Sequence, residues 1–187
     1  MKIGLYGGTF DPIHHGHLIL ARDAMEELGL ERLILIPNAL SPHKLHGNPA
    51  APGLRLAMIR EAIRGEKGLE CDAIELERGG TSYTIDTVLH MRERFPNADL
   101  HYLVGADNLP ELHTWRRIEE LSLLVNFVVL LRGGEETHYP YPVLKRQIEI
   151  SASDIRERVA KNLSIRYLVP DSVREMIQTI GLYREVS

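Results

Sequence analysis

A glycine-rich stretch with three histidines holds the residues best suited to bind phosphate. It runs Gly-Gly-Thr-Phe-Asp-Pro-Ile-His-His-Gly-His over residues 7–17. Gly7 and Gly8 have no Cβ, so a ligand can approach the main chain closely. His14 and His17 are three residues apart, so they can share one face of a helix that begins there. Two glycines, a threonine hydroxyl and two imidazoles, in this order along the chain, predict a phosphate site.

The flanking residues predict that this stretch joins a buried strand to a helix. An apolar run at residues 2–6 precedes it, and apolar side chains recur at helical spacing over residues 18–28. The stretch would then lie at the carboxyl end of a strand, where open α/β sheets bind ligands. The helix start would add unpaired N–H groups and the positive end of its dipole. A tight turn with capping residues and solvated histidines is the simpler alternative, but it does not explain the whole string.

Length and composition indicate one globular domain over residues 1–187, with 44% hydrophobic and 26% charged residues. The net charge of −4 gives no overall basic surface for nucleic acid or anionic membrane. The single cysteine, Cys71, allows no internal disulfide and is expected to be a small core residue. No signal-peptide core and no run of about 18 apolar residues is found. We therefore expect a cytoplasmic protein without a nucleic-acid or membrane partner.

Alternating apolar runs predict a doubly wound parallel sheet of the Rossmann-like kind, because strands and helices take turns along the chain. The predicted strands cover residues 2–6, 32–36, 73–76, 100–104 and 126–131, and the helices between them cover 18–28, 54–64, 85–94 and 115–124. Two C-terminal helices, at 153–161 and 172–180, complete a single α/β domain.

A long irregular loop is expected at residues 37–53, which hold four prolines and two glycines. Loops of this length are usually functional. Within it, Lys44 ends a Ser-Pro-His-Lys tetrapeptide and could act as a mobile point charge over a phosphate. A solvated surface lysine explains the tetrapeptide equally well.

Aromatic residues mark two further turns. Tyr83 and Thr84 lie within residues 79–87, a glycine- and hydroxyl-rich turn whose side chains can cap the next helix. Trp115, the only tryptophan, has polar neighbours that include Arg116. A helix cap explains the threonine, and a lone tryptophan more often lies in a core, but neither explains an aromatic Tyr83 among small polar residues.

Two more polar clusters follow predicted strands or precede predicted helices. Gly105 ends the fourth strand at the same edge as the first glycines, and Asp107 beside it could bind ribose hydroxyls or cap a helix. Ser151 and Ser153 precede the helix that carries Arg156, so hydroxyls and a guanidinium gather at a second helix start. An N-cap accounts for only one of these serines.

Together these motifs resemble the nucleotidyltransferase superfamily with the H-x-G-H motif. The first stretch is similar to its G-G-T-F-D-P-x-H-x-G-H signature. Residues 82–87 and the G-x-D-x-L pattern at Gly105 resemble the bacterial nicotinate-mononucleotide adenylyltransferase branch. Ser41 stands where that branch usually has proline, and Ala152 where it usually has serine. The resemblance covers residues 3–156.

The resemblance implies an enzyme of NAD biosynthesis that transfers an adenylyl group from ATP to nicotinate mononucleotide, giving nicotinate adenine dinucleotide and pyrophosphate. It assigns ATP binding to Gly7, Gly8, Thr9, Phe10, His14, His17, Gly105, Asp107, Ser151, Ser153 and Arg156. Of these, His14, His17 and Arg156 would act in catalysis. It assigns mononucleotide binding to Lys44, Tyr83, Thr84, Trp115 and Arg116. Mg²⁺ is expected to arrive with the ATP phosphates and not on a protein metal site, since no carboxylate cluster lies in these motifs. Whether the chain forms a homo-oligomer stays open.

Three alternatives stay open at this point. The acceptor could be nicotinamide mononucleotide or phosphopantetheine. The protein could be a regulatory module that holds a pyridine nucleotide without turnover. It could also be a metal protein, because the spacing of His14, His17, His43 and His46 could suit zinc, although no cysteine accompanies them.

Overall fold

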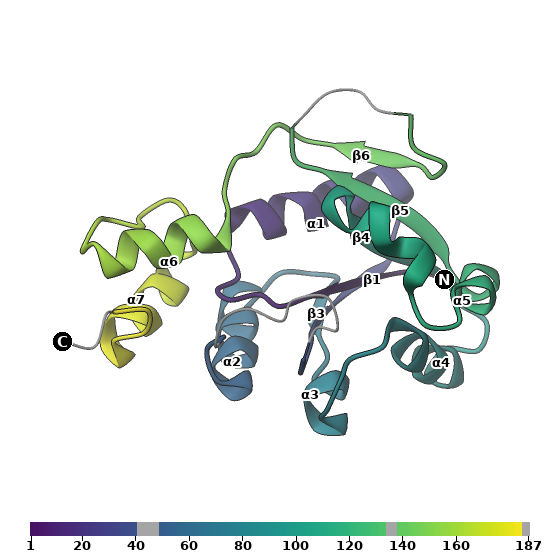
Figure 1. Cartoon of the computed structure of the whole chain (residues 1–187), viewed down its shortest axis with the longest axis horizontal. Coiled ribbons are helices and arrows are strands. Elements are labelled where there is room, and N and C mark those ends of the chain that lie inside the picture. The colour runs from purple at the N-terminus through teal and green to yellow at the C-terminus, as the bar shows by residue number, and fades with distance from the viewer. Residues whose placement is uncertain (41–48, 134–137, 185–187) are drawn as a thin grey trace.

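A parallel sheet forms the centre of the computed structural model, which describes residues 1–40, 49–133 and 138–184 (Figure 1). In these ranges the strands are β1 (Lys2–Gly8), β2 (Arg32–Pro37), β3 (Leu69–Cys71), β4 (Asp99–Gly105), β5 (Asn126–Leu131) and β6 (Val143–Lys145). They form a 6-stranded sheet in the order β3-β2-β1-β4-β5-β6, and every pair is parallel. The order confirms the predicted doubly wound, Rossmann-like sheet.

Helices cover both faces of the sheet. They are α1 (His15–Leu28), α2 (Pro52–Ala62), α3 (Ile74–Arg78), α4 (Thr84–Arg94), the 3₁₀ helix η1 (Ala106–Thr114), α5 (Ile118–Leu124), α6 (Ala152–Ala160) and α7 (Asp171–Ile180). Side chains of α1, α2, α6 and α7 pack with one face, and those of α4, α5 and η1 with the other. No helix within the described ranges is long and apolar enough to span a membrane.

Side chains of β1 alternate between the two cores, as the period of a strand requires. Ile3 and Leu5 are fully buried in one hydrophobic cluster, whereas Tyr6 belongs to the other. The chain runs outward from β1 through β2 to β3 and then returns to β4 on the other side of β1, so the direction of strand addition reverses there. Ligands bind at the carboxyl end of the strands at such a switch point, and this is where Gly8 and Gly105 end their strands.

The strand predicted at residues 73–76 is wrong, because α3 begins at Ile74 and the strand of this region is β3, at Leu69–Cys71. Asp72 explains the difference: its main-chain N–H continues the ladder to Leu35, while its Oδ1 accepts from the N–H of Ile74 at 2.9 Å. The side chain therefore ends the strand and starts the helix in one step. Cys71 lies in β3 as a half-buried free thiol, and burial raises its pKa to about 12.

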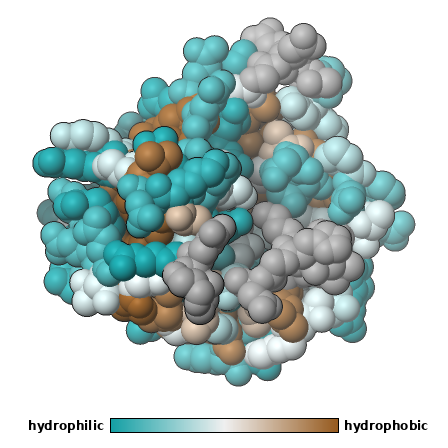
Figure 2. All heavy atoms as spheres, turned by 60° about the vertical axis from the view of Figure 1, so that its left-hand side comes forward, coloured by the Kyte–Doolittle hydropathy of each residue, from teal (hydrophilic) through white to brown (hydrophobic). Residues whose placement is uncertain are grey.

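The helix predicted at residues 115–124 begins three residues later, at Ile118, because Arg117 before it has a left-handed backbone, with φ 55°, that a right-handed helix cannot include. Neither η1 nor β6 was predicted. Pro110 inside η1 breaks any longer helical pattern, and β6 has only three residues. The end of the molecule that carries α6 and α7 has a mostly hydrophilic surface with separate hydrophobic patches (Figure 2).

Candidate active site

Two histidines meet where the turn after β1 enters α1. The rings of His14 and His17 stack with centroids 3.7 Å apart and planes 23° apart. The main-chain N–H of His14 donates to Nδ1 of His17 at 3.3 Å. Because Nδ1 accepts, the proton of a neutral His17 ring lies on Nε2. The edge of the Phe10 ring packs against the His17 ring, with centroids 5.0 Å apart, and fixes its place.

His14 is the most unusual polar group of this turn. Its side chain is fully buried, and within the described ranges neither ring nitrogen has a hydrogen-bond partner. Burial, with a smaller contribution from the charge of Arg132, lowers its pKa from 6.5 to about 3. The ring is therefore neutral at pH 7. Buried polar groups are nearly always satisfied, so the polar ring of His14 stands out at this strand-to-helix turn, where the main-chain N–H of His17 faces it as in a capping box.

The glycines of the turn make room for the protein's own side chains. A Cβ at Gly7 would lie 2.5 Å from the hydroxyl of Tyr102, and a Cβ at Gly8 would lie 3.0 Å from the Phe10 ring. The Tyr102 hydroxyl in turn lies 3.4 Å from Oγ1 of Thr84. Tyr102 thus joins the glycine turn to the turn at the start of α4, a link that the spacing of motifs did not predict.

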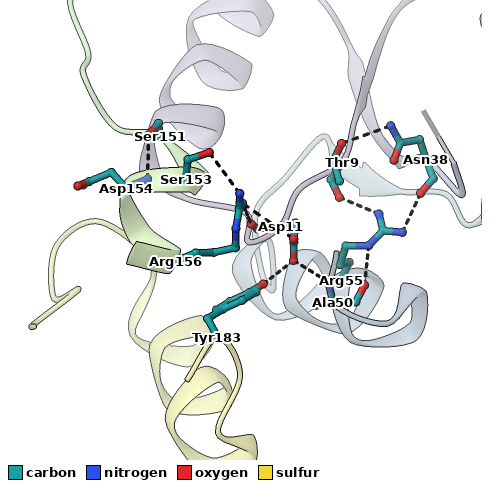
Figure 3. Close-up of polar contacts among 10 residues, drawn as sticks. All are labelled: Thr9, Asp11, Asn38, Ala50, Arg55, Ser151, Ser153, Asp154, Arg156 and Tyr183. Atoms are coloured by element: carbon teal, nitrogen blue, oxygen red, sulfur yellow. Dashed lines mark hydrogen bonds and ion pairs between the residues drawn. The ribbon is translucent and has the colours of Figure 1, made fainter. Parts of the chain in front are cut away.

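The start of α6 lies against the same glycine-rich turn (Figure 3). Ser151 is the N-cap, since its Oγ accepts from the N–H of Asp154 at 3.1 Å. Arg156 donates from Nη1 to the main-chain carbonyl of Asp11 at 2.7 Å and from Nη2 to Oγ of Ser153 at 3.2 Å. The fold therefore brings the motif at residues 151–156 against the glycine-rich turn at residues 7–17. The role of Ser151 as the N-cap of α6 is sufficient to explain that serine.

Arg55 is a buried cation that the sequence analysis missed. It is 1% exposed and donates to three main-chain carbonyls: those of Thr9 at 2.8 Å, Asn38 at 2.9 Å and Ala50 at 3.0 Å. It therefore ties the glycine turn to both described ends of the 37–53 loop (Figure 3). Burial lowers its pKa, and the charge of Asp11 opposes that shift. Nothing in the helical pattern of α2 distinguishes it from a surface arginine.

Asp11 is a buried residue of the turn itself, and the sequence analysis did not select it as a site residue. Its Oδ1 accepts from the hydroxyl of Tyr183 at 2.6 Å and from the N–H of Ala50 at 3.1 Å. Its Oδ2 lies 3.9 Å from Nη1 of Arg156. Asp11 is 6% exposed, and its two hydrogen-bond donors and its ion-pair partner come from three separate parts of the chain.

The residues predicted to bind the mononucleotide come together in part. The Arg116 guanidinium lies 4.8 Å from the centroid of the Tyr83 ring, and its Nη1 lies 3.9 Å from Oδ2 of Asp86. Trp115 is half-buried and packs edge-on against Tyr102, with centroids 5.9 Å apart. Trp115 also packs against Phe127, with centroids 6.4 Å apart, so the core position that a lone tryptophan favours holds in part.

The remaining predicted residues fall into two groups. A Cβ at Gly105 would collide with the Asp107 carboxylate, which is exposed at the start of η1 and accepts from Asn108 at 3.1 Å. Lys44 lies outside the described residues, as do the two further histidines of the zinc alternative. Within the described ranges no group of three or more metal-ligating side chains is found.

The fold and this arrangement define an α/β protein whose glycine-rich turn lies at the switch point of a doubly wound sheet, where such folds bind ligands. The cytidylyltransferase-like family matches residues 5–158. A protein named probable nicotinate-nucleotide adenylyltransferase, from Opitutus terrae, is 43% identical over 192 residues, which cover 98% of each chain. The nicotinate-nucleotide adenylyltransferase of Bacillus subtilis is 37% identical over 185 residues, 97% of this chain and 98% of that one.

The chain belongs to the cytidylyltransferase-like family, in the group of the nicotinate-nucleotide adenylyltransferases. A solved structure supports the fold independently. The nicotinic acid mononucleotide adenylyltransferase of Plasmodium falciparum, complexed with NaAD, superposes with a TM-score of 0.79 at 20% identity and 97% coverage of both chains.

Proposed function

We propose that this chain transfers the adenylyl group of ATP to nicotinate mononucleotide, giving nicotinate adenine dinucleotide and pyrophosphate. The observation that carries the proposal is the meeting of two helix starts on one glycine turn. α1 brings the stacked pair His14 and His17, and α6 brings Ser153 and Arg156, whose guanidinium is bound to that turn. Imidazole donors, a bidentate cation and helix dipoles suit a triphosphate.

The proposed reaction is an in-line displacement at the α-phosphorus of ATP. A phosphate oxygen of the mononucleotide forms the new P–O bond, and the bond from the α-phosphorus to the oxygen that bridges to the β-phosphorus breaks. That bridging oxygen leaves with pyrophosphate. The nucleophile is already ionised at neutral pH, so no general base is required. Catalysis then consists of holding both phosphates in line and stabilising the charge that develops.

Each side chain at the turn has a separate task in this proposal. His17 holds a proton on Nε2 because its Nδ1 accepts from the main chain, so it can donate to a phosphate oxygen. His14, kept neutral by burial, can donate from one ring nitrogen. Arg156 and Ser153 would hold the β- and γ-phosphates, where negative charge accumulates as pyrophosphate leaves.

Mg²⁺ fits this site only as a companion of the nucleotide. The described residues offer no cluster of three metal ligands, and Mg²⁺ is commonly held through substrate phosphates with few protein ligands. Bound in that way, the ion neutralises phosphate charge. The side chains of this chain would bind the phosphate oxygens that the ion leaves free.

We further propose that the pyridine ring of the acceptor lies beside Tyr83 and Trp115. The half-buried Trp115 ring packs against Tyr102 and Phe127, and Arg116 lies over Tyr83. An aromatic platform beside a guanidinium suits a ring that bears a carboxylate. Asp107 at the start of η1 would face the adenosine ribose.

Product analysis tests this function against its rivals. The purified protein is incubated with ATP, Mg²⁺ and one of three acceptors: nicotinate mononucleotide, nicotinamide mononucleotide or phosphopantetheine. We expect nicotinate adenine dinucleotide and pyrophosphate in equal amounts from the first. Faster turnover of another acceptor would make that compound the substrate. Binding of nucleotide without release of pyrophosphate, whichever acceptor is present, would instead support the regulatory module.

A further inference from the structure

The segment after α7 returns to the glycine-rich turn near the start of the chain. Gly181 ends α7 in the left-handed conformation, with φ 74° and its N–H bound to the Ile177 carbonyl at 3.0 Å. Glycine is favoured in such a cap because it has no Cβ. The chain then reverses, and the Tyr183 hydroxyl donates to Oδ1 of Asp11 at 2.6 Å (Figure 3).

Tyr183 holds an unfavourable backbone conformation to make this contact. Its φ is 62°, in the left-handed region that bulky residues rarely adopt. Such conformations persist only where surrounding contacts compensate for them. Here the ring packs against the hydrophobic core and the hydroxyl binds a carboxylate that is 6% exposed. Burial, together with the hydrogen bond to Asp11, raises the pKa of Tyr183, so the hydroxyl stays a donor.

Asp11 transmits this contact to Arg156. The Tyr183 hydroxyl and the N–H of Ala50 both donate to Oδ1, so the carboxylate plane is fixed. That orientation turns Oδ2 toward Nη1 of Arg156, 3.9 Å away, while the same Nη1 donates to the Asp11 carbonyl. The guanidinium is therefore held on the turn by one residue, whose side chain Tyr183 holds in place.

We propose that Tyr183 is a positioning residue for the triphosphate of ATP and acts through Asp11 on Arg156. The inference rests on the proposed function in one respect, the binding of phosphate oxygens by Arg156. Without the hydroxyl, the Asp11 carboxylate loses its shortest hydrogen bond and the guanidinium loses a fixed partner. Binding of ATP weakens as a result, whereas the mononucleotide site beside Tyr83 is built by other elements and keeps its affinity.

The variant Tyr183→Phe removes only the hydroxyl and keeps the packed ring. Titration calorimetry with α,β-methylene-ATP measures nucleotide affinity without turnover, and steady-state kinetics give KM for both substrates. We expect the Kd for the analogue and the KM for ATP to rise about fivefold to tenfold, with the KM for nicotinate mononucleotide unchanged. The matched control is Tyr167→Phe, at a tyrosine that is 77% exposed between α6 and α7. It should change none of these values.

A double-mutant cycle shows whether the effect passes through the guanidinium. Added to Arg156→Lys, the change Tyr183→Phe should weaken binding of the analogue by less than about twofold, because the residue it positions is gone. An undiminished effect in that background would overturn the inference, as would equal losses for both substrates or a lowered Tm with normal affinity.

The two proposals fail in different ways. If the wild-type protein binds the analogue but forms no dinucleotide, the proposed function fails, and the calorimetric comparison still decides the role of Tyr183. If the wild-type protein is active and Tyr183→Phe binds the analogue normally, only the role of Tyr183 fails.

Discussion

At the scale of single residues, the site depends on side chains that are already fixed before a nucleotide binds. His17 is held by a main-chain N–H and by the Phe10 ring, and His14 is fully buried beneath it. Arg156 is held by the carbonyl of Asp11. Donors that need no rearrangement in the transition state contribute most to catalysis of charge-developing reactions. Variants at these positions should therefore lower turnover more than stability.

We expect His17→Ala to lower kcat by about 10²–10³-fold, the usual effect of removing one preorganised donor. Steady-state kinetics measure the loss, and circular dichroism shows that the variant is folded. His15→Ala is the matched control, because His15 lies in the same turn and binds Leu168 only through its main-chain N–H. A folded His17→Ala variant with nearly normal kcat would remove His17 from the catalytic residues.

Arg156→Lys should lower kcat/KM for ATP by about tenfold or more, although the charge is kept. A guanidinium can bind two phosphate oxygens at once and an ammonium cannot. The comparison variant is Arg158→Lys, two residues further along α6, where the side chain binds the Ser164 carbonyl at 2.9 Å. A larger loss for the mononucleotide than for ATP would place Arg156 outside the triphosphate site.

His14 should make the folded protein sensitive to acid. Its pKa lies near 6.5 in the unfolded chain and is lowered to about 3 in the folded one, so the unfolded state binds a proton that the folded state does not. Its contribution to the free energy of unfolding is complete above pH 6.5 and decreases as the pH falls toward 3, by up to about 1.4 kcal/mol per pH unit. Urea unfolding at pH 7, 6 and 5 should show a smaller decrease for His14→Gln. Equal decreases would mean that His14 titrates normally in the fold.

At the scale of elements, the glycine turn, the 37–53 loop and the turn before α4 form one assembly. Arg55 binds both described ends of the loop. The loop start is further bound to Ser82, whose Oγ accepts from the N–H of Ala39 at 2.9 Å and whose N–H donates to Leu40. The described ends of the loop, residues 37–40 and 49–53, are thus anchored beside both proposed substrate sites.

Arg55→Lys should destabilise the protein, because an ammonium cannot reach three carbonyls that a guanidinium fork satisfies. Leaving even one buried acceptor unpaired costs about 1–3 kcal/mol, which corresponds to a fall in Tm of about 3–10 °C for a chain of this size. Thermal unfolding followed by circular dichroism measures it. Arg60→Lys, at an exposed position of the same helix, should leave Tm within about a degree or two. Equal shifts for the two variants would contradict the anchoring role of Arg55.

At the scale of the whole molecule, the sheet could be predicted because its strands are apolar runs separated by amphipathic helices. The run at residues 126–131 coincides with β5, and the two C-terminal helices match α6 and α7 within one residue at each end. The errors fall where one side chain decides the outcome, as at Asp72, or where an element is as short as β6.

Residues of the proposed site could be predicted only where they lie in compact motifs. His14, His17, Ser153 and Arg156 come from two such motifs, and the fold brings them to one turn. The positioning residues were not predictable in this way. Tyr183 lies 172 residues from Asp11 along the chain, and tertiary contact alone pairs them.

The proposal that the acceptor is nicotinate mononucleotide, and not the amide, depends on the hydrogen-bond donors that face the pyridine substituent. A carboxylate accepts hydrogen bonds only, whereas the NH₂ of an amide donates. By family resemblance, main-chain N–H groups near Thr84 and Arg116 would face that group. Each buried donor left unpaired by the amide costs about 1–3 kcal/mol, which corresponds to about fivefold to a hundredfold in rate or affinity.

The most direct test of the account is therefore kcat/KM for nicotinate mononucleotide and for nicotinamide mononucleotide, each with saturating ATP and Mg²⁺. The account predicts that the acid is preferred by at least about fivefold, and by more if two donors discriminate. Equal values, or a preference for the amide, would contradict it and make nicotinamide mononucleotide the acceptor.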